Sequence, residues 1–372
     1  MTRLMMMLLN EGVFQGNQLL QKESIEMMFR RQFSNLPELP GYSLGIEEQL
    51  FNGYPAVAKG GGTLGFVSAM LLFPDHSLGV FTTTNVASDD FIEMFMRQLA
   101  PRLFKSDENP SSSTSVNVDI KLNRFTGTYR SNRYNHHTIE DFVALFLESI
   151  TVRSTDNGML TFYHGGAYQE YVAIKSLIFQ NTKDGSDLLI FDENERGKVV
   201  NLYRNGTFAG LSVPLSYEKV PWFSSPHFVN ELLSWLAFIL MTSILIPLVW
   251  LVIFLIRLAK KDFSQKQSWP KPAQLSVFFL GILSVVHLFG YVAQTNRLGL
   301  ALVFGVPTAL LRLNYIPFII IILFLILTYH TYKIWLLRSA AILARIYYAV
   351  FSVSALTYLL VLYRWHFIGF HI

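Results

Sequence analysis

Uncharged apolar runs long enough to cross a bilayer fill the last third of the chain. They occupy residues 232–256, 273–293, 313–332 and 346–363. A helix needs about 20 apolar residues to span the hydrocarbon core, so this pattern predicts about four transmembrane helices within 228–372. Another apolar stretch, at 298–311, is too short to span and contains Pro307. We expect it to form an interfacial or re-entrant segment.

Before these runs, shorter helical and strand-like patterns alternate, which predicts a mixed α/β region at the start of the chain. Strand-like segments bounded by Gly, Pro or Asn fall at 42–46, 56–59, 66–73 and 78–84. Pro74 opens a turn between the last two, so we expect a β-hairpin there. Ser24 is predicted to cap a helix over 25–31, and Ser88 to open a helix that ends near Phe104.

The middle of the chain combines a polar linker with frequent turn signals. Residues 106–119 are polar and rich in Ser, which is typical of a linker. The turn sequences that follow, such as Asn157-Gly158, predict a small antiparallel β-barrel or sandwich over 120–222, with one helix near 139–148. Its predicted strands include 160–163, 188–191 and 199–203. The resulting division of the chain is 1–105, 106–119, 120–222 and 228–372.

Charge sharpens the membrane prediction. Charged residues make up 15% of the chain, against about 25% in an ordinary soluble domain. After Asp262 the sequence contains no Asp or Glu, so the net charge of +4 reflects basic loops rather than a nucleic-acid-binding surface. Lys and Arg concentrate after the first run and between the third and fourth. By the positive-inside rule, the region before the runs and the C-terminus are predicted to be extracytoplasmic.

Several kinds of chemistry are excluded or disfavoured by residue type. The chain has no Cys, which excludes thiol catalysis, disulfides and Cys-zinc sites. His136 and His137 are adjacent, but no third ligand stands at a metal-binding spacing, so we expect a polar loop and no cofactor. His287 and His330 lie in predicted spans, either as functional groups or as neutral histidines bonded between helices. Without Asp or Glu in any span, a transporter is disfavoured.

The densest candidate for a binding site is the sequence Lys59-Gly60-Gly61-Gly62-Thr63. Consecutive glycines at a strand edge let a ligand or another backbone approach closely, and a cation there can hold an anion. No G-K-[ST] follows, so the motif is not a phosphate-binding loop. A glycine-rich connection with a solvated lysine is the alternative interpretation.

The same stretch, continued through the Pro-Asp turn to Asn85, resembles the C-terminal part of the serine β-lactamase-like family. That family includes class C β-lactamases, penicillin-binding proteins and related esterases. The resemblance implies a partial α/β transpeptidase-like domain over 1–105. It also implies that Lys59 supplies the cation of the family's third motif, and that Gly60, Gly61, Gly62 and Thr63 line the substrate site. Residues 120–222, through Phe125, Gly127 and Tyr129, resemble the lipocalin-like β domain often attached to such enzymes.

Two further motifs of this family, Ser-x-x-Lys with the nucleophile and Tyr-x-Asn with a general base, are missing before Lys59. We therefore expect a chain that is N-terminally truncated relative to the family and inactive as a hydrolase. Later matches, Ser216 to Lys219 and Tyr203 to Asn205, stand in reversed order outside the matching region, and we attribute them to chance.

Two functional hypotheses follow from these patterns. The first is a membrane-anchored, extracytoplasmic member of the serine hydrolase family, whose intact relatives act on peptide, β-lactam or ester bonds, including those of cell-wall peptides. The second is a non-enzymatic binding or scaffold protein held in the cell membrane. Membrane lipid is the expected partner in both, and no nucleic acid is expected. The sequence leaves the oligomeric state open.

Overall fold

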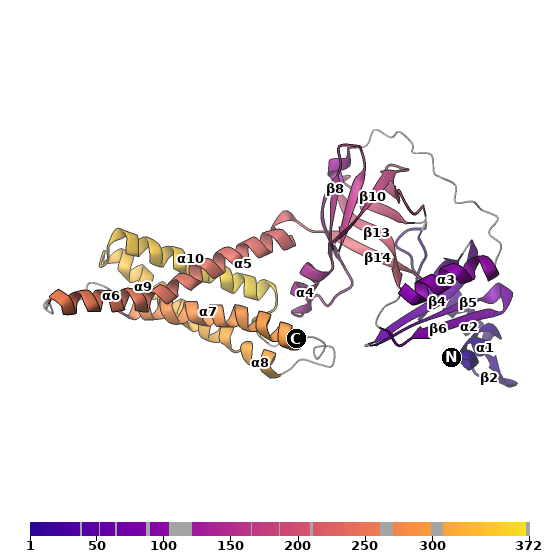
Figure 1. Cartoon of the computed structure of the whole chain (residues 1–372), viewed down its shortest axis with the longest axis horizontal. Helices are drawn as coiled ribbons and strands as arrows, with labels where there is room; N and C mark the ends of the chain where they lie inside the picture. Colours follow the sequence, from indigo (N-terminus) through magenta and orange to yellow (C-terminus); the bar gives the residue numbers. More distant parts are fainter. Residues whose placement is uncertain are drawn as a thin grey trace. The chain divides into compact units, whose positions relative to one another are not determined.

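The computed structural model of the chain divides into two compact units. It describes residues 1–37, 39–51, 53–63, 65–86, 90–103, 121–164, 166–185, 187–208, 211–260, 271–298 and 308–369. The first unit combines Met1–Arg133 with Glu148–Val220, and the second combines Tyr134–Leu147 with Pro221–Ile372. Figure 1 shows a small sheet, a β-barrel and a set of long helices. The chain is thus multidomain, as its pattern predicted, and the linker expected at 106–119 lies outside the described residues.

A four-stranded antiparallel sheet forms the first part of the first unit. Its strands are β3 (Glu47–Phe51), β4 (Tyr54–Thr63), β5 (Phe66–Phe73) and β6 (Leu78–Thr84), in that order. The hairpin predicted at 66–73 and 78–84 is confirmed, with a single 3-10 turn, Pro74–His76, between its strands. Ser77 ends this turn in the left-handed conformation, at φ 51°.

Helices cover both faces of this sheet. The helices are α1 (Thr2–Leu9), α2 (Lys22–Phe29) and α3 (Asp90–Leu103), and a two-stranded ribbon, β1 (Val13–Phe14) with β2 (Asn17–Gln18), lies between the first two. Leu8 of α1 and Ile25 of α2 pack with Leu72 in one cluster, whereas Ile92 of α3 packs with Leu71 in another. Because Leu71 and Leu72 are consecutive strand residues, they point to opposite faces, and each face has its own core.

Two predictions in this region are wrong. Residues 42–46 form no strand; Tyr42 makes only isolated bridges, to Phe33 and Glu47, because the chain bends between them. Helix α2 begins at Lys22, with the extended Gln21 before it, so Ser24 lies inside the first turn and does not cap the helix. The cap predicted at Ser88 lies outside the described residues.

The β-rich part of the first unit is a closed antiparallel barrel, which decides between the predicted barrel and sandwich. Its strands run in the order β10-β11-β12-β13-β14-β7-β8-β9. Their bounds are β7 (Gly127–Ser131), β8 (Ser149–Ser154), β9 (Leu160–His164), β10 (Ala167–Ala173), β11 (Ile178–Asn181), β12 (Leu188–Glu193), β13 (Val199–Phe208) and β14 (Leu211–Lys219). Closure gives every strand two neighbours and leaves no open edge.

Aromatic side chains fill the barrel. The ring of Phe125 lies 5.0 Å from that of Phe179 and 4.7 Å from that of Phe191, measured between centroids. Tyr129 is fully buried beside them and donates its hydroxyl hydrogen to the carbonyl of Phe125 at 2.6 Å. These side chains occupy the centre of the barrel as a packed core, as in other small eight-stranded barrels.

Side-chain bonds join the sheet to the barrel within the first unit. The amide of Gln49, on β3, donates to the carbonyl of Ser212 at 2.6 Å and accepts from its N–H at 2.8 Å. The Gln49 side chain therefore bonds both the C=O and the N–H of Ser212, as the backbone of a neighbouring strand would. The hydroxyl of Tyr42 donates to the carbonyl of Pro214 at 2.7 Å.

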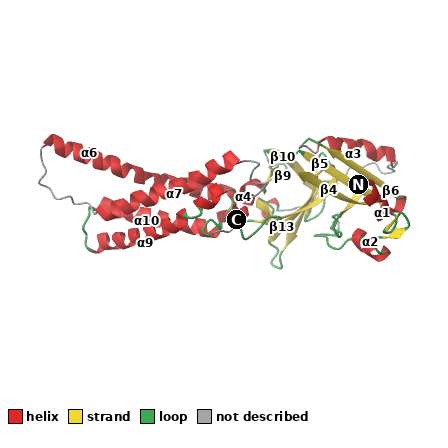
Figure 2. Ribbon diagram, turned by 90° about the horizontal axis from the view of Figure 1, so that it is seen from below, coloured by secondary structure: helices red, strands yellow, loops and turns green. Residues whose placement is uncertain are grey.

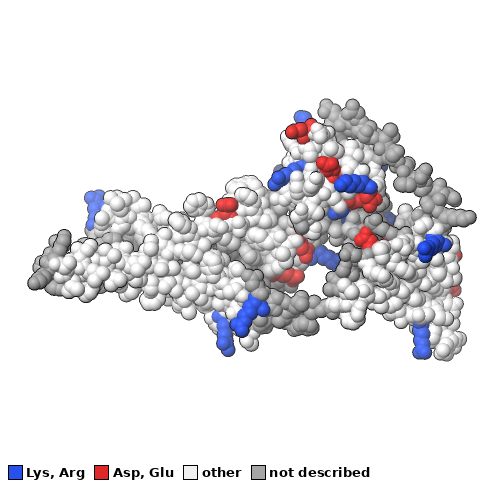
Figure 3. Space-filling model, in the orientation of Figure 1, with Lys and Arg blue, Asp and Glu red and all other residues white. Residues whose placement is uncertain are grey.

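The second unit is helical. It contains α4 (Glu140–Leu147), α5 (Pro226–Met241), α6 (Leu245–Lys260), α7 (Lys271–Leu298), α8 (Thr308–Leu313), α9 (Ile316–Leu336) and α10 (Ile342–Arg364). Among the described residues, four helical stretches are long and apolar enough to cross a membrane: Pro226–Ile256, Pro272–Gln294, Thr308–Leu336 and Ile342–Arg364. They lie lengthwise beside one another (Figure 2). On the face drawn in Figure 3, their surface carries few charged side chains.

The helical unit agrees with the predicted pattern and adds detail to it. The first predicted run, 232–256, contains a short 3-10 segment, Thr242–Ile244, between α5 and α6. Of the segment predicted at 298–311, residues 299–307 lie outside the described residues, and α8 begins at Thr308. The helix expected near 139–148 is α4.

Candidate functional site

The glycine-rich motif lies on a strand rather than in a connection. Residues Lys59 to Thr63 continue β4 and pair with β5, where Gly61 faces Ser68 and Thr63 faces Phe66. A Cβ on Gly61 would lie 3.3 Å from the Ser68 hydroxyl, so glycine permits this close approach. On the other side, β3 pairs with β4 only as far as Ala58. Among the described strands, the segment from Lys59 to Thr63 therefore has one neighbour and one open side.

Lys59 is held by an ion pair at this open side. Its ammonium Nζ lies 2.9 Å from Oε1 of Glu47, and the two side chains are 50% and 15% exposed. A pair this exposed contributes little to stability, because water screens the charges and both side chains lose freedom. The lysine side chain is also half exposed to solvent.

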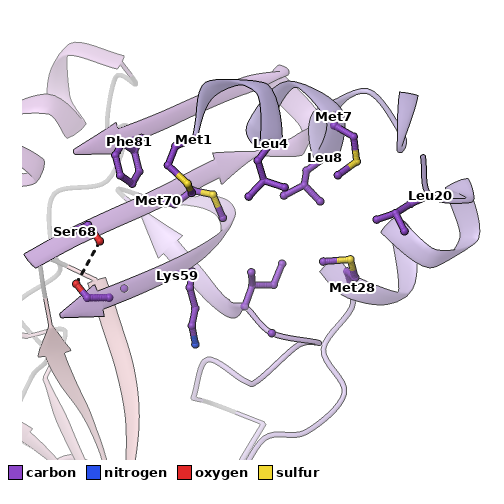
Figure 4. Close-up of a pocket in the computed structure, with 14 residues that line it drawn as sticks. Met1, Leu4, Met7, Leu8, Leu20, Met28, Lys59, Ser68, Met70 and Phe81 are labelled. Atoms are coloured by element: carbon purple, nitrogen blue, oxygen red, sulfur yellow. Dashed lines mark hydrogen bonds between the residues drawn. The ribbon is translucent and has the colours of Figure 1, made fainter. Parts of the chain in front are cut away.

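An apolar cavity of about 350 Å³ opens beside Lys59. Figure 4 shows helix α1 and strand β5 contributing apolar side chains, with Lys59 and Ser68 at the polar end. The lining residues are Met1, Leu4, Met7, Leu8, Leu20, Met28, Gly45, Ile46, Lys59, Gly60, Gly61, Ser68, Met70 and Phe81. Four of them are methionines, whose flexible thioethers adapt to ligands of different shapes.

The cavity brings together part of the predicted site. Lys59, Gly60 and Gly61 line it, whereas Gly62 and Thr63 lie farther along β4, outside its lining. Ser68, which was not among the predicted site residues, carries the one hydroxyl group among the lining residues. This hydroxyl donates a hydrogen bond to the carbonyl of Gly61 at 3.3 Å. The arrangement offers a cation, a strand edge and an apolar wall, which suits binding of an anionic group attached to an apolar one.

A buried polar cluster stands on the barrel and was not predicted. Arg204 donates from Nε and Nη2 to the two carboxylate oxygens of Asp187, both at 2.9 Å. Asp187 also accepts from Tyr171 at 2.6 Å and from Asn181 at 2.8 Å. Burial raises the pKa of the Tyr171 hydroxyl well above its ordinary value. Asn181, Asp187 and Arg204 line a cleft of about 1170 Å³ between the barrel and the sheet of the same unit.

The later Ser-x-x-Lys match cannot act as a catalytic pair. Ser216 and Lys219 lie on β14, and residues three apart in a strand point to opposite faces, whereas on a helix they would share one. The Ser216 hydroxyl accepts from Asn132 at 2.9 Å, while the Lys219 ammonium donates to the carbonyl of Arg124 at 2.7 Å. Burial lowers the pKa of Lys219.

The singled-out histidines lie in separate places. Within the described part of the chain, no group of three or more His, Asp or Glu residues could hold a metal ion. The ring of His136 packs on Tyr134, with 4.2 Å between centroids. His287 is buried in the helical unit with Nδ1 2.9 Å from the hydroxyl of Tyr358, while His330 is half-buried on α9. His287 thus has the bonded, between-helix placement that was one of its two interpretations.

No protein-family model matches the chain, and no curated protein does. Among solved structures, the chain is distantly similar to SurE with D-Leu and to SurE, each at 14% identity and a TM-score of 0.35 over 56% of this chain. It is also distantly similar to the octameric penicillin-binding protein homologue from Pyrococcus abyssi, at 14% identity and a TM-score of 0.24 over 57% of this chain. The chain spans less than half the length of these proteins, with 45%, 44% and 44% of each covered.

Proposed function

We propose that this protein is a membrane-anchored relative of the penicillin-binding-protein-like serine hydrolases that binds an acidic ligand without hydrolysing it. The observation that carries the proposal is the open side of β4 at Lys59, where cation, glycine backbone and apolar cavity meet. The resemblance of Lys59-Gly60-Gly61 to the family's third motif supports a substrate-like ligand. We place the protein in a cell membrane, which the four long apolar helices would span.

The ligand class follows from what these groups can recognise. An extended peptide can add to an open strand edge through main-chain hydrogen bonds. Lys59 would bind the ligand's carboxylate in place of Glu47. The cavity lined by methionine and leucine would take an apolar side chain. A short peptide with a free C-terminal carboxylate and an apolar last residue meets all three requirements, and a β-lactam or ester acid meets two.

Hydrolysis is not proposed because, among the described residues that line the cavity, none is an activated nucleophile. A serine nucleophile needs an adjacent base within hydrogen-bond reach. Ser68 is instead hydrogen-bonded to the carbonyl of Gly61, and the nearby Lys59 is paired with Glu47. The Ser216 and Lys219 pair faces two sides of a strand and offers no alternative.

A scaffold role is the second candidate, and one observation favours it. The barrel centre is filled by Phe125, Phe179 and Phe191, so the barrel acts as a rigid body. The links from Gln49 to Ser212 would then hold the sheet on that body. In that reading the open side of β4 would have no ligand of its own.

Methyl NMR of labelled methionine separates the two candidates, because Met7, Met28 and Met70 line the cavity. The full chain in lipid nanodiscs is titrated with an acetylated dipeptide ending in leucine carboxylate. Binding predicts shifts at these methyl groups that disappear in Lys59→Ala. Lys22→Ala is the matched control, because Lys22 is also about half exposed and ion-paired, to Glu11, at 2.6 Å. Unchanged spectra in the unsubstituted protein would favour the scaffold.

A further inference from the structure

Helix α4 belongs to the barrel in sequence and to the helical unit in structure. It connects β7, which ends at Ser131, to β8, which begins at Ser149. Residues Tyr134–Leu147 nevertheless form one compact unit with Pro221–Ile372. The connection between two barrel strands is therefore built to rest on the long helices.

One face of α4 is fixed to the ends of two long helices. Leu145 is fully buried and packs with Val229 of α5 and with Trp365, directly after α10. The ring of Phe142 meets Trp365 edge-on at 5.6 Å between centroids. Asp141, also buried, accepts a charge-assisted hydrogen bond from Arg364 at 2.9 Å. This combination fixes the rotation of α4 about its own axis.

The opposite face of α4 is apolar and exposed. Val143, Phe146 and Leu147 are 43%, 39% and 70% exposed. Just before α5, Trp222 and Phe223 are 73% and 55% exposed. Both groups belong to the helical unit, and Val229 of α5, which packs with Leu145 of α4, lies six residues after Phe223. Large apolar side chains left exposed to water mark interaction sites.

We propose that Val143, Phe146, Leu147, Trp222 and Phe223 form a lipid-binding collar in the interfacial layer of the bilayer. A lipid surface is the favoured occupant because α4 packs at the ends of two long apolar helices, on Val229 near the start of α5 and on Trp365 directly after α10. Tryptophan is enriched at the headgroup level, and a helix face that carries Trp, Phe or Leu can lie in the interface plane. The collar ties the loop between β7 and β8 to the membrane surface. The inference rests on the membrane location proposed above.

Site-directed spin labelling tests the collar on the full chain, because the sequence has no Cys to give background. The Leu147→Cys label is compared with Val353→Cys on α10 and Tyr168→Cys on the barrel, which replace side chains 63% and 65% exposed. In nanodiscs, frequent collisions of the spin label with oxygen indicate a lipid environment, and frequent collisions with a water-soluble nickel chelate indicate exposure to water. We expect the Leu147→Cys label to collide more with oxygen, and less with nickel, than the Tyr168→Cys label.

Two outcomes would overturn the collar. In the first, the Leu147→Cys label is as accessible to nickel as the Tyr168→Cys label, while the Val353→Cys label reports lipid. The helices would then be in the membrane, but the proposed collar would be wrong. The other is spin–spin broadening at Leu147→Cys, which would assign the patch to a second copy of the chain. If Leu147→Cys fails to fold, Phe146→Cys replaces it. If Val353→Cys itself reports water, the proposed membrane location has failed, and the collar with it.

Discussion

The barrel and the four-stranded sheet differ in their strand edges. The barrel closes on itself, so each of its strands has two neighbours and its centre is packed with aromatic rings. The sheet leaves β4 open from Lys59 onward, next to an apolar cavity. An unpaired strand edge costs stability and invites pairing with another chain. From this difference we infer that the barrel is the more stable part, and we propose that binding occurs at the sheet.

The strongest test of this contrast removes a ring from the barrel core. Phe191→Ala should lower the free energy of unfolding of the barrel by about 3–5 kcal/mol, through lost burial and the cavity left behind. Hydrogen exchange of the full chain in nanodiscs would show faster exchange throughout the barrel strands. Tyr168→Ala, at a barrel position that is 65% exposed, serves as control and should change exchange only locally.

The buried cluster on the barrel should have the next largest effect. Asp187→Ala removes the carboxylate that accepts from Nε and Nη2 of Arg204, which should cost about 3 kcal/mol. The measurement is the same hydrogen exchange, read in β12 and β13. The exposed Asp156→Ala gives the baseline, and equal effects of the two substitutions would show that the cluster does not stabilise the barrel.

Alkaline pH should weaken the barrel before the sheet. Burial raises the pKa values of Tyr129 and Tyr217 in the folded barrel. An unfolded tyrosine ionises near pH 10, so above that pH the unfolded state loses protons that the folded state retains, and stability falls as pH rises. Unfolding measured from pH 8 to 11 should show a shallower pH dependence in Tyr129→Phe. The pKa of Lys219 is lowered in the folded state, so its contribution to stability rises with pH. Lys219 is present in the unsubstituted protein and in Tyr129→Phe alike, so its effect cancels in the comparison.

The smallest effect on stability is expected at the candidate site. Lys59→Ala removes an ion pair with one half-exposed partner, which is worth less than about 1 kcal/mol. Binding should respond much more than folding. A thermal unfolding midpoint that changes little, together with loss of the dipeptide-induced methyl shifts, would assign Lys59 to the ligand rather than to the fold.

The sequence predicted the structural features that depend on residues close together in the chain. The hairpin at Phe66–Phe73 and Leu78–Thr84 followed from alternating segments and a Pro-led turn, and it is confirmed. The long apolar helices likewise follow from composition alone. The glycines after Lys59 were expected at a strand edge, but they continue β4 because pairing with β5 overrides their weak strand preference.

Features set by distant contacts could not be predicted. Arg204 and Asp187 stand 17 residues apart in sequence and meet only because β12 and β13 pair. The ion pair of Asp141 with Arg364 joins residues 223 apart. No short pattern around any of these residues indicates its partner.

The most direct test of the proposed function is a hydrolysis assay on the purified full chain in nanodiscs, with a chromogenic β-lactam and a p-nitrophenyl ester. We expect a hydrolysis rate equal to that of empty nanodiscs and unchanged by Lys59→Ala. Turnover by the unsubstituted protein that Lys59→Ala abolishes would contradict it, because the open side of β4 would then be part of an active centre.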